Sequence, residues 1–516
     1  MTKDNMNLQS IPKEKFAFAN TGERLSDKKF DDKPIGYFKD AWLRFRKNKA
    51  SIIAAWIILG IVLFAIFMPL LNTRYDATFL DPYYAKKGPR NNFLSNFGIA
   101  TGAVQRDFNE RGYMLALATG VGADGYDGET VPADEVTKKY MPIRKLRSER
   151  KNNGKTTFTA DIDTYLEIGF LYIAIEQSEL AKMQAWEEET GLPLLYPLIE
   201  NNEYCADITN ANYWYRADSK LNPLDENDNK IKYDEDMVFV DNYMRDSEGN
   251  LVYYTYTGGG SVDTAQYKVR VLYHNYYMYK NGFEPQYIFG TDSQGYDLAL
   301  RMAIGIRLSL LVAVCVSAIN FLIGAVYGAV EGYYGGTVDI LMERVSDILA
   351  GVPFIVVSTL FQIHLAQKVG PIPSLLFAFV MTGWIGTASR VRTQFYRFKN
   401  QEYVMAARTL GARDRRIIWK HIFPNSLGTI ITSSVLVIPS VIFSESMLSF
   451  LGIVNLGGSK MTSLGTLLSD ASSIWTNYPH LMLFPAIIIS LLMISFNLFG
   501  NGLRDAFNPS LRGVEE

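Results

Sequence analysis

The sequence predicts an integral membrane protein with an all-α membrane domain of about six transmembrane helices and an inserted α+β domain outside the cytoplasm. Six stretches of 20 residues or more contain no Asp, Glu, Lys or Arg. A polar region, residues 72–290, separates the first stretch from the other five. Two strongly basic clusters flank the apolar stretches, as expected for segments on the cytoplasmic side of a membrane.

The averages of the whole chain hide this organisation. A length of 516 residues, a formal net charge of −2 and a mean hydropathy of 0.00 are typical of a soluble protein of a few domains. Residues 72–290, however, contain 33 acidic and 23 basic side chains, whereas the rest of the chain contains 20 acidic and 28 basic ones. An acidic polar region and a basic membrane part therefore cancel in the totals.

The apolar stretches are long enough to be transmembrane helices, since about 20 apolar helical residues span a bilayer core. One such stretch could be a buried helix of a soluble protein, but six in one chain favour a membrane protein. The first follows 49 mostly polar residues, so we expect it to be retained rather than cleaved as a signal peptide. The predicted transmembrane segments are 50–71, 308–330, 348–367, 369–389, 425–444 and 480–503.

Basic residues determine the predicted orientation. Residues 33–49 contain six Lys or Arg and one acid, and residues 390–421 contain nine Lys or Arg and two acids. We expect both segments, the N-terminal segment 1–49 and both chain termini to be cytoplasmic. The predicted cytoplasmic loop 331–347 fits this rule less well, because it carries four acidic residues and one Arg.

The polar insertion has the patterns of a mixed α+β domain. Runs rich in β-branched and aromatic residues predict strands, and a helix is predicted from Ser178, as its N-cap, through Glu188 to a stop at Gly191. The insertion also contains 23 of the chain's 31 tyrosines. A tyrosine-rich interface is one interpretation, but ordinary packing in a strand-rich domain is the more common one. The predicted strands are 170–175, 194–199, 237–240, 251–257 and 267–279.

No residue pattern in the sequence is typical of catalysis or metal binding. Cys205 and Cys315, the only cysteines, lie in different predicted compartments and exclude a disulfide framework. None of the four histidines has metal-ligand spacing, and the acidic run 225–236 lacks the Gly and Glu of an EF-hand loop. We therefore expect no cofactor, no metal site and no catalytic residue in this chain.

Residues 402–424 are too polar to span a membrane and too regular for an irregular linker. They predict a short helix–turn–helix that breaks at a glycine, followed by a proline that opens the next transmembrane helix, where its missing N–H costs nothing. The small side chains would let another backbone approach, and the surrounding arginines could bind acids of a partner. A basic loop that contacts lipid headgroups is the alternative. The residues that set the pattern are Glu402, Ala406, Ala407, Leu410, Gly411 and Pro424.

The same stretch resembles the EAA loop of binding-protein-dependent ABC importer permeases. The family pattern is Glu-Ala-Ala, three residues, Gly, nine residues, and then Ile-x-Leu-Pro. The chain departs from it at Met405, His421 and Phe423, and Glu402, one turn earlier, could take over the polar role of the motif Glu. The residues that match the pattern are Ala406, Ala407, Gly411 and Pro424.

Five further segments resemble the C-type permease subunit of oligopeptide and dipeptide importers. One of them, FGTDSQGYDLALR (289–301), is similar to the Gly-Thr-Asp-x-x-Gly-x-Asp segment before the second transmembrane helix of that subfamily. The resemblance covers residues 37–71 and 288–512, about half of the chain, and leaves most of the insertion outside. The other segments are AWLRFRKNKAS (41–51), GYYGGTVDILMERVSDIL (332–349), SESMLSFLG (444–452) and FNLFGNGLRDAFNPSLR (496–512).

The resemblance implies one permease subunit of a type I ABC importer that carries oligopeptides across a bacterial cell membrane. Its implied partners are a B-type permease, two ATPases that bind ATP and Mg²⁺, membrane lipid, and an extracytoplasmic peptide-binding lipoprotein, with no role for nucleic acid. The chain itself has no G-x-x-x-x-G-K-[ST] phosphate loop and is not expected to hydrolyse ATP. The residues implied to couple to the ATPases are Glu402, Met405, Ala406, Ala407, Arg408, Gly411 and Pro424.

Glu445 is an ionisable residue at the outer end of the fifth predicted segment. A charge at membrane depth is a candidate for the translocation path. A role in helix packing fits equally well, because serines and other small residues surround it in the sequence.

Other classes of protein are compatible with parts of the sequence. A membrane-anchored receptor or sensor would bind a ligand through the insertion, but it would need a cytoplasmic output domain, and only short segments are predicted inside. An ABC exporter subunit would lack the 402–424 pattern, and an enzyme would need a nucleophile and base in the insertion. Four regions are therefore expected: 1–49, 50–71, the insertion 72–290, and a permease core 291–512.

Overall fold

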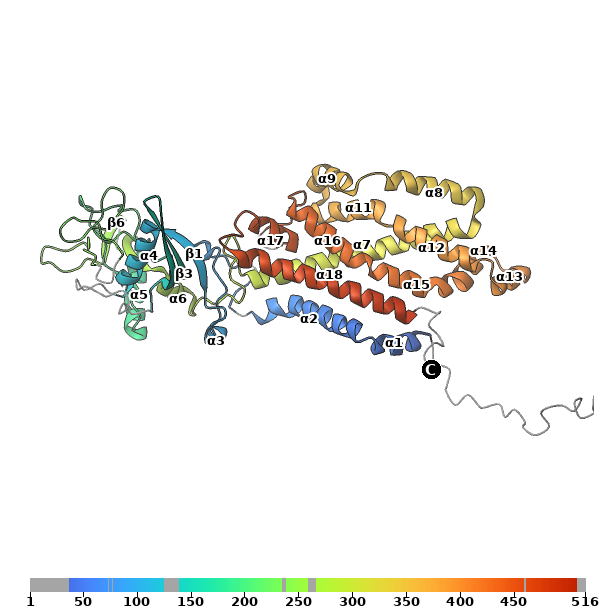
Figure 1. Ribbon diagram of the computed structural model, residues 1–516, viewed down its shortest axis with the longest axis horizontal. Helices are drawn as coiled ribbons and strands as arrows, with labels where there is room; N and C mark the ends of the chain where they lie inside the picture. The colour runs from blue at the N-terminus through green and yellow to red at the C-terminus, as the bar shows by residue number, and fades with distance from the viewer. Residues whose placement is uncertain are drawn as a thin grey trace, which may run out of the picture.

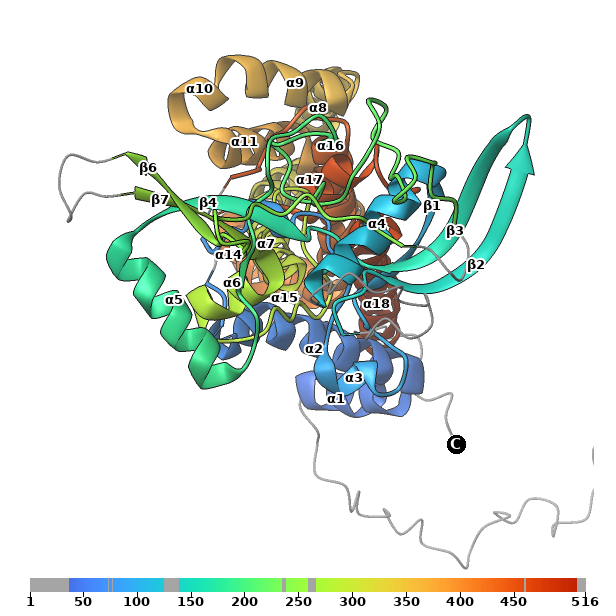
Figure 2. The ribbon, with the colours of Figure 1, turned by 90° about the vertical axis from the view of Figure 1, so that its left-hand side faces the viewer.

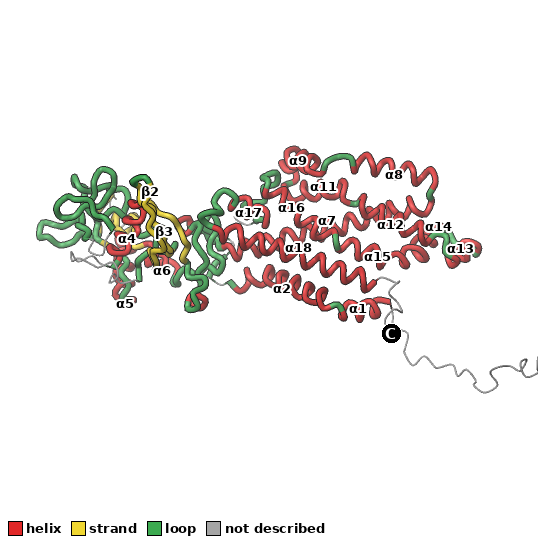
Figure 3. Tube along the Cα trace, in the orientation of Figure 1, coloured by secondary structure: helices red, strands yellow, loops and turns green. Residues whose placement is uncertain are grey.

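The computed structural model describes residues 37–72, 74–76, 78–124, 139–233, 238–258, 266–458 and 461–507. Figure 1 shows an elongated bundle of helices with a mixed α/β part at one end, and Figure 3 shows that the strands are confined to that part. The chain enters the mixed part after α2 (Lys49–Leu71) and leaves it before α7 (Leu298–Tyr334). The predicted fold class, a helical membrane domain with an inserted α+β part, is confirmed.

Within the described residues, five helical segments are long and apolar enough to cross a membrane, and five of the six predicted segments fall largely within them. The longest single helix, α7, has 37 residues and measures about 55 Å, more than the bilayer core of about 30 Å requires. The five segments are α2, α7, Pro371–Phe398 (α11, Pro371–Gly383, and α12, Ile385–Phe398), Asp414–Phe450, and α18 (Pro479–Phe507).

The prediction of a single helix over 348–367 is wrong. Pro353 separates α8 (Gly336–Ala350) from α9 (Phe354–His364), because proline has no N–H to donate and disfavours helical geometry in the residue before it. With 11 residues, α9 is about 16 Å long and cannot span a bilayer core by itself. The stretch 331–347, predicted as a loop, is largely α8, which runs back along the bundle (Figure 1).

Helix α7 is the centre of the bundle and contacts α2, α11, α12 and α16. Its glycines at intervals of four residues allow α12 to approach closely, as small residues do in membrane helix pairs. A Cβ added at Gly324 would lie 2.8 Å from the backbone oxygen of Trp384, the residue before α12. One added at Gly332 would lie 2.8 Å from the backbone oxygen of Arg392, in α12. The remaining helices are α1 (Tyr37–Lys47), α10 (Ala366–Val369), α13 (Glu402–Thr409), α14 (Asp414–Arg416), α15 (Phe423–Val435), α16 (Val437–Phe450) and α17 (Leu464–Ala471).

The described residues of the insertion form two small antiparallel sheets. Strands of the first are ordered β1-β3-β2, and those of the second are ordered β4-β7-β5, with β6 also paired to β7. The strands are β1 (Ala103–Asn109), β2 (Ile143–Asn152), β3 (Lys155–Asp163), β4 (Phe170–Glu176), β5 (Leu195–Tyr196), β6 (Tyr254–Gly258) and β7 (Gln266–Leu272). The helices are α3 (Asn92–Ser95), α4 (Glu110–Ala123), α5 (Gln177–Thr190) and α6 (Tyr273–Asn281), and Pro82–Tyr84 form a 3₁₀ turn.

Three predicted elements of the insertion are present. The predicted strand 170–175 is β4, the predicted strand 251–257 overlaps β6, and the helix predicted after β4 is α5. Gly191 ends α5 with a left-handed φ of 66°, as expected for a glycine after a helix. Ser178 is not the N-cap, because the helix begins one residue earlier, at Gln177.

Other predictions in the insertion are wrong. Of the predicted strand 194–199, only the two residues of β5 pair regularly, and residues 238–240 form no strand, while Met237 lies outside the described residues. The predicted strand 267–279 is β7 followed by helix α6. Aromatic residues favour strands, but here the packing of α6 against other tyrosines overrides that preference.

The long hairpin of β2 and β3 is absent from the predicted elements, although a local signal for it exists in the sequence. Asn153 and Gly154 form its turn with φ values of 50° and 75°. An Asn-Gly pair favours a tight turn because both residues tolerate positive φ. Figure 2 shows the hairpin projecting sideways from the insertion.

A cluster of six buried tyrosines joins the two passages of the chain between the bundle and the insertion. The hydroxyl of Tyr273 lies 2.7 and 2.6 Å from the two carboxylate oxygens of Asp81, to which it donates its one proton, and the hydroxyl of Tyr277 lies 3.3 Å from that of Tyr287. These side chains are packed in a core rather than displayed as an interface. The tyrosine cluster is Tyr75, Tyr84, Tyr165, Tyr273, Tyr277 and Tyr287.

Candidate functional site

The segment 402–424 forms the predicted helix–turn–helix. Helix α13 (Glu402–Thr409) is followed by a turn in which Gly411 has a φ of 79°, and the chain becomes helical again at Asp414. Figure 1 places α13 and α14 at the end of the bundle opposite the insertion. Nothing lies within 4 Å of a Cβ built at Gly411, so the backbone conformation, and not crowding within this chain, favours glycine there.

Helix α13 is attached to the bundle through one buried side chain and a short polar chain of contacts. Val404 is fully buried in an apolar cluster with Phe395 of α12 and Ile417. The hydroxyl of Tyr333, at the end of α7, donates a 2.6 Å hydrogen bond to Asp414 and accepts one of 3.4 Å from Arg408. A displacement of α13 would therefore reach α7, α12 and the helix that begins at Asp414.

Both apolar and basic side chains are exposed on α13 and at its C-terminal end. Leu410 is 87% exposed and Met405 is 50% exposed, which is unusual for large apolar side chains at a polar tip and indicates a partner surface. Glu402, Ala406 and Arg408 are also exposed, whereas Ala407 is half-buried. Next to the turn lies an open cavity of about 490 Å³, lined by Arg413, Arg415, Arg416, Trp419 and Lys420.

Pro424 does not start a new helix in the way the sequence suggested. The chain is continuously helical from Asp414, and Pro424 is the second residue of α15, directly after a π-helical turn at Ile417–Ile422. A wider π turn accommodates the missing N–H of a proline within a helix.

An ion cluster lies near the same end of the bundle. Arg392 of α12 contacts Asp339 at 2.6 and 2.8 Å and Glu343 at 3.0 Å, both on α8, and Glu331 of α7 at 3.6 Å. Tyr396 also donates a 2.5 Å hydrogen bond to Asp339. Three of the four acids of the stretch 331–347, which fitted the orientation rule poorly, thus neutralise an arginine of the neighbouring helix α12.

Glu445 is buried at the other end of the bundle. Ser309 of α7 donates a 2.8 Å hydrogen bond to one carboxylate oxygen, and Ser449 donates a 3.1 Å bond to the other. The side chain is 1% exposed within this chain and connects α16 to α7. This geometry agrees with the helix-packing alternative, and a role in the translocation path stays a prediction.

Among the described residues, no group of three or more His, Cys, Asp and Glu side chains could hold a metal ion. Cys205 and Cys315 are both free thiols.

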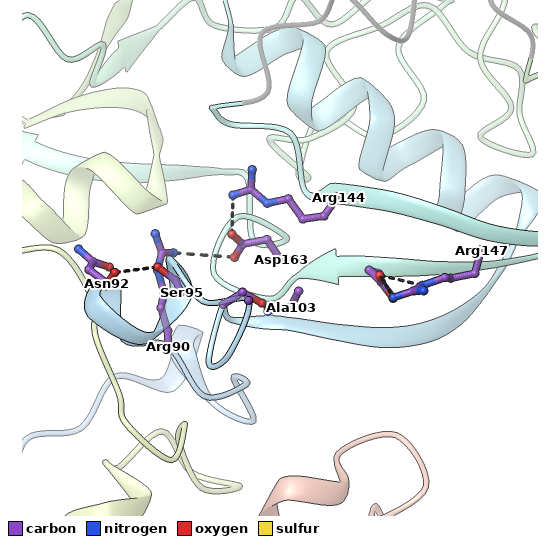
Figure 4. A pocket seen from close by; sticks show the side chains of 10 residues that line it. Arg90, Asn92, Ser95, Ala103, Arg144, Arg147 and Asp163 are labelled. Carbon is purple, nitrogen blue, oxygen red and sulfur yellow. Dashed lines mark hydrogen bonds and ion pairs between the residues drawn. The ribbon is translucent and has the colours of Figure 1, made fainter.

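The insertion contains a polar pocket that sequence analysis missed. It has a volume of about 630 Å³, and Figure 4 shows Arg90, Arg144 and Asp163 gathered at one end and Arg147 at the other. Arg144 is 2.7 Å from Asp163, and Arg147 is 2.7 Å from Asp161. The lining residues come from the loop before β1 and from β1, β2 and β3, so no local sequence signal could have found it.

Two family models match the chain. Residues 322–513 match the family described as binding-protein-dependent transport system inner membrane component. Residues 36–89 match the N-terminal TM domain of oligopeptide transport permease C. Residues 90–321, which include most of the insertion, lie outside both matched ranges.

Several curated proteins are similar to this chain over a comparable length. The oligopeptide transport system permease protein OppC of Bacillus subtilis is 41% identical over 225 residues, which are 43% of this chain and 72% of that protein. The dipeptide transport system permease protein DppC of the same organism is 42% identical over 226 residues, 43% of this chain and 69% of that protein. OppC of Haemophilus influenzae is 43% identical over 231 residues, 44% of this chain and 72% of that protein.

Proposed function

Because this chain belongs to the OppC/DppC-type permeases of binding-protein-dependent peptide ABC transporters, we propose that it imports oligopeptides by forming half of a translocation path. It is a multi-pass membrane protein and, like other permeases of this family, has no ATPase activity of its own. The other half of the path would come from a B-type permease. Peptide would be delivered by an extracytoplasmic binding lipoprotein, and two ATPases would supply ATP-driven motion.

The geometry of α13 carries the coupling part of this proposal. Two large apolar side chains, Met405 of α13 and Leu410 at its C-terminal end, are exposed on a segment that also carries the exposed Arg408. Helix α13 is attached to the bundle through the buried Val404. This combination suits a helix that docks into an acidic-rimmed groove of an ATPase and moves with it. Glu402, Ala406, Ala407, Arg408 and Gly411 would form the contact, and Pro424, at the root of α15, would lie where the motion enters the membrane.

A contact between α13 and the ATPases would also imply how the chain is oriented in the membrane. If α13 faces the ATPases, the end of the bundle that carries α13 is cytoplasmic and the insertion is extracytoplasmic. The described chain begins with α1 and ends with α18, and α1 and the last part of α18 lie toward the α13 end of the bundle (Figure 1), which supports cytoplasmic termini. The insertion would then stand at the mouth of the path, where it could dock the binding protein or guide peptide inward.

The test is a bulky substitution at Gly411 compared with one at Gly336. Both glycines have positive φ and open space around a Cβ, and both lie toward the α13 end of the bundle, but only Gly411 lies in the segment 402–424. We expect Gly411→Trp to abolish uptake of labelled peptide while the protein still reaches the membrane, and Gly336→Trp to retain uptake. Normal uptake by Gly411→Trp would remove the coupling assignment and favour a receptor role.

Labelled peptides of graded length would test the substrate class. Oligopeptide transport predicts that peptides longer than two residues compete for uptake more strongly than dipeptides. Competition by dipeptides alone would assign a dipeptide importer instead.

A further inference from the structure

The loop 91–101, which contains α3, displays large apolar side chains that nothing in the described chain covers. Phe93 and Phe97 are each 70% exposed and Ile99 is 61% exposed, and the two rings meet edge to face with their centroids 5.7 Å apart. Three large exposed apolar side chains on one short loop indicate a contact with a partner or with a membrane.

The position of this loop favours the membrane. The flanking residues Lys86 and Arg106 both contact Tyr478, the residue before α18, and Arg106 donates a 3.4 Å hydrogen bond to its hydroxyl. Figures 1 and 2 agree in placing α3 beside the outer end of α2. The last two residues of α2, Leu70 and Leu71, are also exposed. The loop that carries the exposed phenylalanines therefore lies near the level where the exposed apolar helices of the bundle end.

The opposite face of the loop is polar. Asn92 and Ser95, which alternate with the two phenylalanines, line the 630 Å³ pocket together with three arginines. Guanidinium groups bind phosphate oxygens in a bidentate geometry. Asp161 and Asp163 hold Arg147 and Arg144 in place, and their oxygens could also accept hydrogen bonds from an ammonium group. The pocket thus suits a phosphate with a cationic group nearby (Figure 4).

We propose that the loop 91–101 is a lipid-binding foot of the insertion. Phe93 and Phe97 enter the outer leaflet, and the phosphate of a phospholipid headgroup lies in the arginine-lined pocket. Large apolar rings at the boundary between headgroups and acyl chains, with basic side chains behind them, are typical of interfacial binding. The foot would fix the height of the insertion above the membrane. This inference rests on the proposed orientation, in which the insertion is extracytoplasmic.

Fluorescent labels test the depth of the loop. In the full chain with Cys205→Ser and Cys315→Ser, an environment-sensitive dye is attached at Phe97→Cys or, as a control, at Tyr256→Cys. Tyr256 lies on β6, at the far side of the insertion, and is 58% exposed. In liposomes that contain nitroxide-labelled lipid, we expect the dye at position 97 to lose roughly half of its emission and the dye at 256 to be unaffected.

The two outcomes that contradict the proposals are distinct. Equal quenching of both dyes by aqueous iodide, with no quenching by the labelled lipid, would overturn the foot. Failure of external iodide to reach position 256 in right-side-out vesicles would instead overturn the orientation on which the proposed function depends.

Retention of phospholipid tests the pocket. Arg147, whose side chain is half exposed, is changed in Arg147→Gln, and Arg150, on the same strand but outside the pocket, in Arg150→Gln as a control. After detergent extraction, we expect about tenfold less bound phospholipid for Arg147→Gln, as for the loss of a charge-assisted hydrogen bond, and no change for Arg150→Gln. Release of the lipid by millimolar inorganic phosphate would assign a free anion site, and release by a tripeptide would assign a peptide site. Either result would overturn the proposal.

Discussion

The two ends of the helical bundle are held by different kinds of contact. At the insertion end, the chain segments before and after the insertion are joined by the buried tyrosine cluster and by a turn in which Asp292 accepts three backbone N–H bonds. At the opposite end, α13 buries only Val404, and most of its other side chains are exposed. One end is packed like a protein core, and the other is attached at few points.

This difference indicates which parts of the molecule are rigid and which part can move. Helix α7 runs from the first end, where Asp297 caps it, to the second, where Tyr333 contacts Asp414. Elements with few buried contacts open and shift at lower free energy than packed ones. We therefore expect the insertion and the outer ends of α2 and α7 to move as one body, while α13 changes its position relative to the bundle.

The largest expected effect is a loss of folding when the insertion end is disturbed. Gly295 has a φ of 107°, and a Cβ added there would overlap the carbonyl oxygen of Asp81. Gly295→Ala should therefore lower the free energy of unfolding by several kcal/mol, because left-handed strain is added to a backbone clash that cannot relax. Gly249→Ala is the matched control, because Gly249 has a φ of 87° and nothing lies within 4 Å of a Cβ built there. It should lower the free energy of unfolding by about 1 kcal/mol. The yield of monodisperse protein and its thermal midpoint in detergent measure both, and equal midpoints would show that the insertion end is not tightly packed.

The next effect concerns the ion cluster near the opposite end. Arg392→Gln would leave Asp339, Glu343 and Glu331 without their shared cation, so we expect a loss of about 3 kcal/mol. Arg344→Gln removes a single pair to Asp347 from an arginine that is mostly exposed and should change stability by less than about 1 kcal/mol. Denaturant or thermal unfolding of the two variants checks this. A small loss for Arg392→Gln would mean that α8 is held to α12 by apolar packing alone.

Elements that depend on neighbouring residues in the sequence could be predicted, whereas elements that depend on contacts between distant residues could not. Hydropathy over about 20 residues is sufficient to predict α2 and α18, because burial of a helix in lipid depends on its composition alone. It fails at 348–367, where Pro353 divides an apolar run between α8 and α9, and α8 carries acids that Arg392 neutralises. The sequence around those acids predicts a loop, because Arg392 lies 53 positions after Asp339 and 49 after Glu343.

The same distinction applies to the candidate sites. The pattern around Gly411 is local, so the helix–turn–helix and its break were predictable from spacing. The exposure of Leu410 and Met405 and the burial of Val404 depend on α7 and α12, and the residue pattern alone did not reveal them. The arginine-lined pocket combines a loop with three strands, and its residues are brought together only by the sheet.

A pH effect should distinguish the insertion end from the α13 end. Burial raises the pKa of Asp297 to about 6, although backbone N–H groups and the amide of Asn72 partly oppose this. The folded state therefore holds a proton that the unfolded state, with a pKa near 3.8, releases, so this contribution to stability is complete below about pH 4 and is lost as the pH rises through 6. Asp297→Asn keeps the cap but removes the titration. We expect its unfolding free energy to fall less between pH 4 and 7 than that of the parent chain, and parallel profiles would contradict this.

The smallest expected effect is the difference in stability between removing one hydroxyl and removing another inside the tyrosine cluster. Tyr165 and Tyr84 are both fully buried, but the hydroxyl of Tyr165 donates a 2.8 Å hydrogen bond to the carbonyl of Gly88, whereas that of Tyr84 has no hydrogen-bond partner within the described residues. Tyr165→Phe leaves a buried carbonyl without its donor and should cost about 1 to 2 kcal/mol.

Tyr84→Phe removes a hydroxyl that is desolvated without compensation, so it should be neutral or stabilise by up to about 1 kcal/mol. Thermal unfolding of the two single variants and of the double variant measures this difference, because the rings stay in place and only the hydroxyls change. Equal destabilisation by both substitutions would show that the cluster depends on a shared hydroxyl network. The predicted asymmetry would show that it is held by ring packing with a few defined hydrogen bonds, which is the property that makes the insertion end the rigid one.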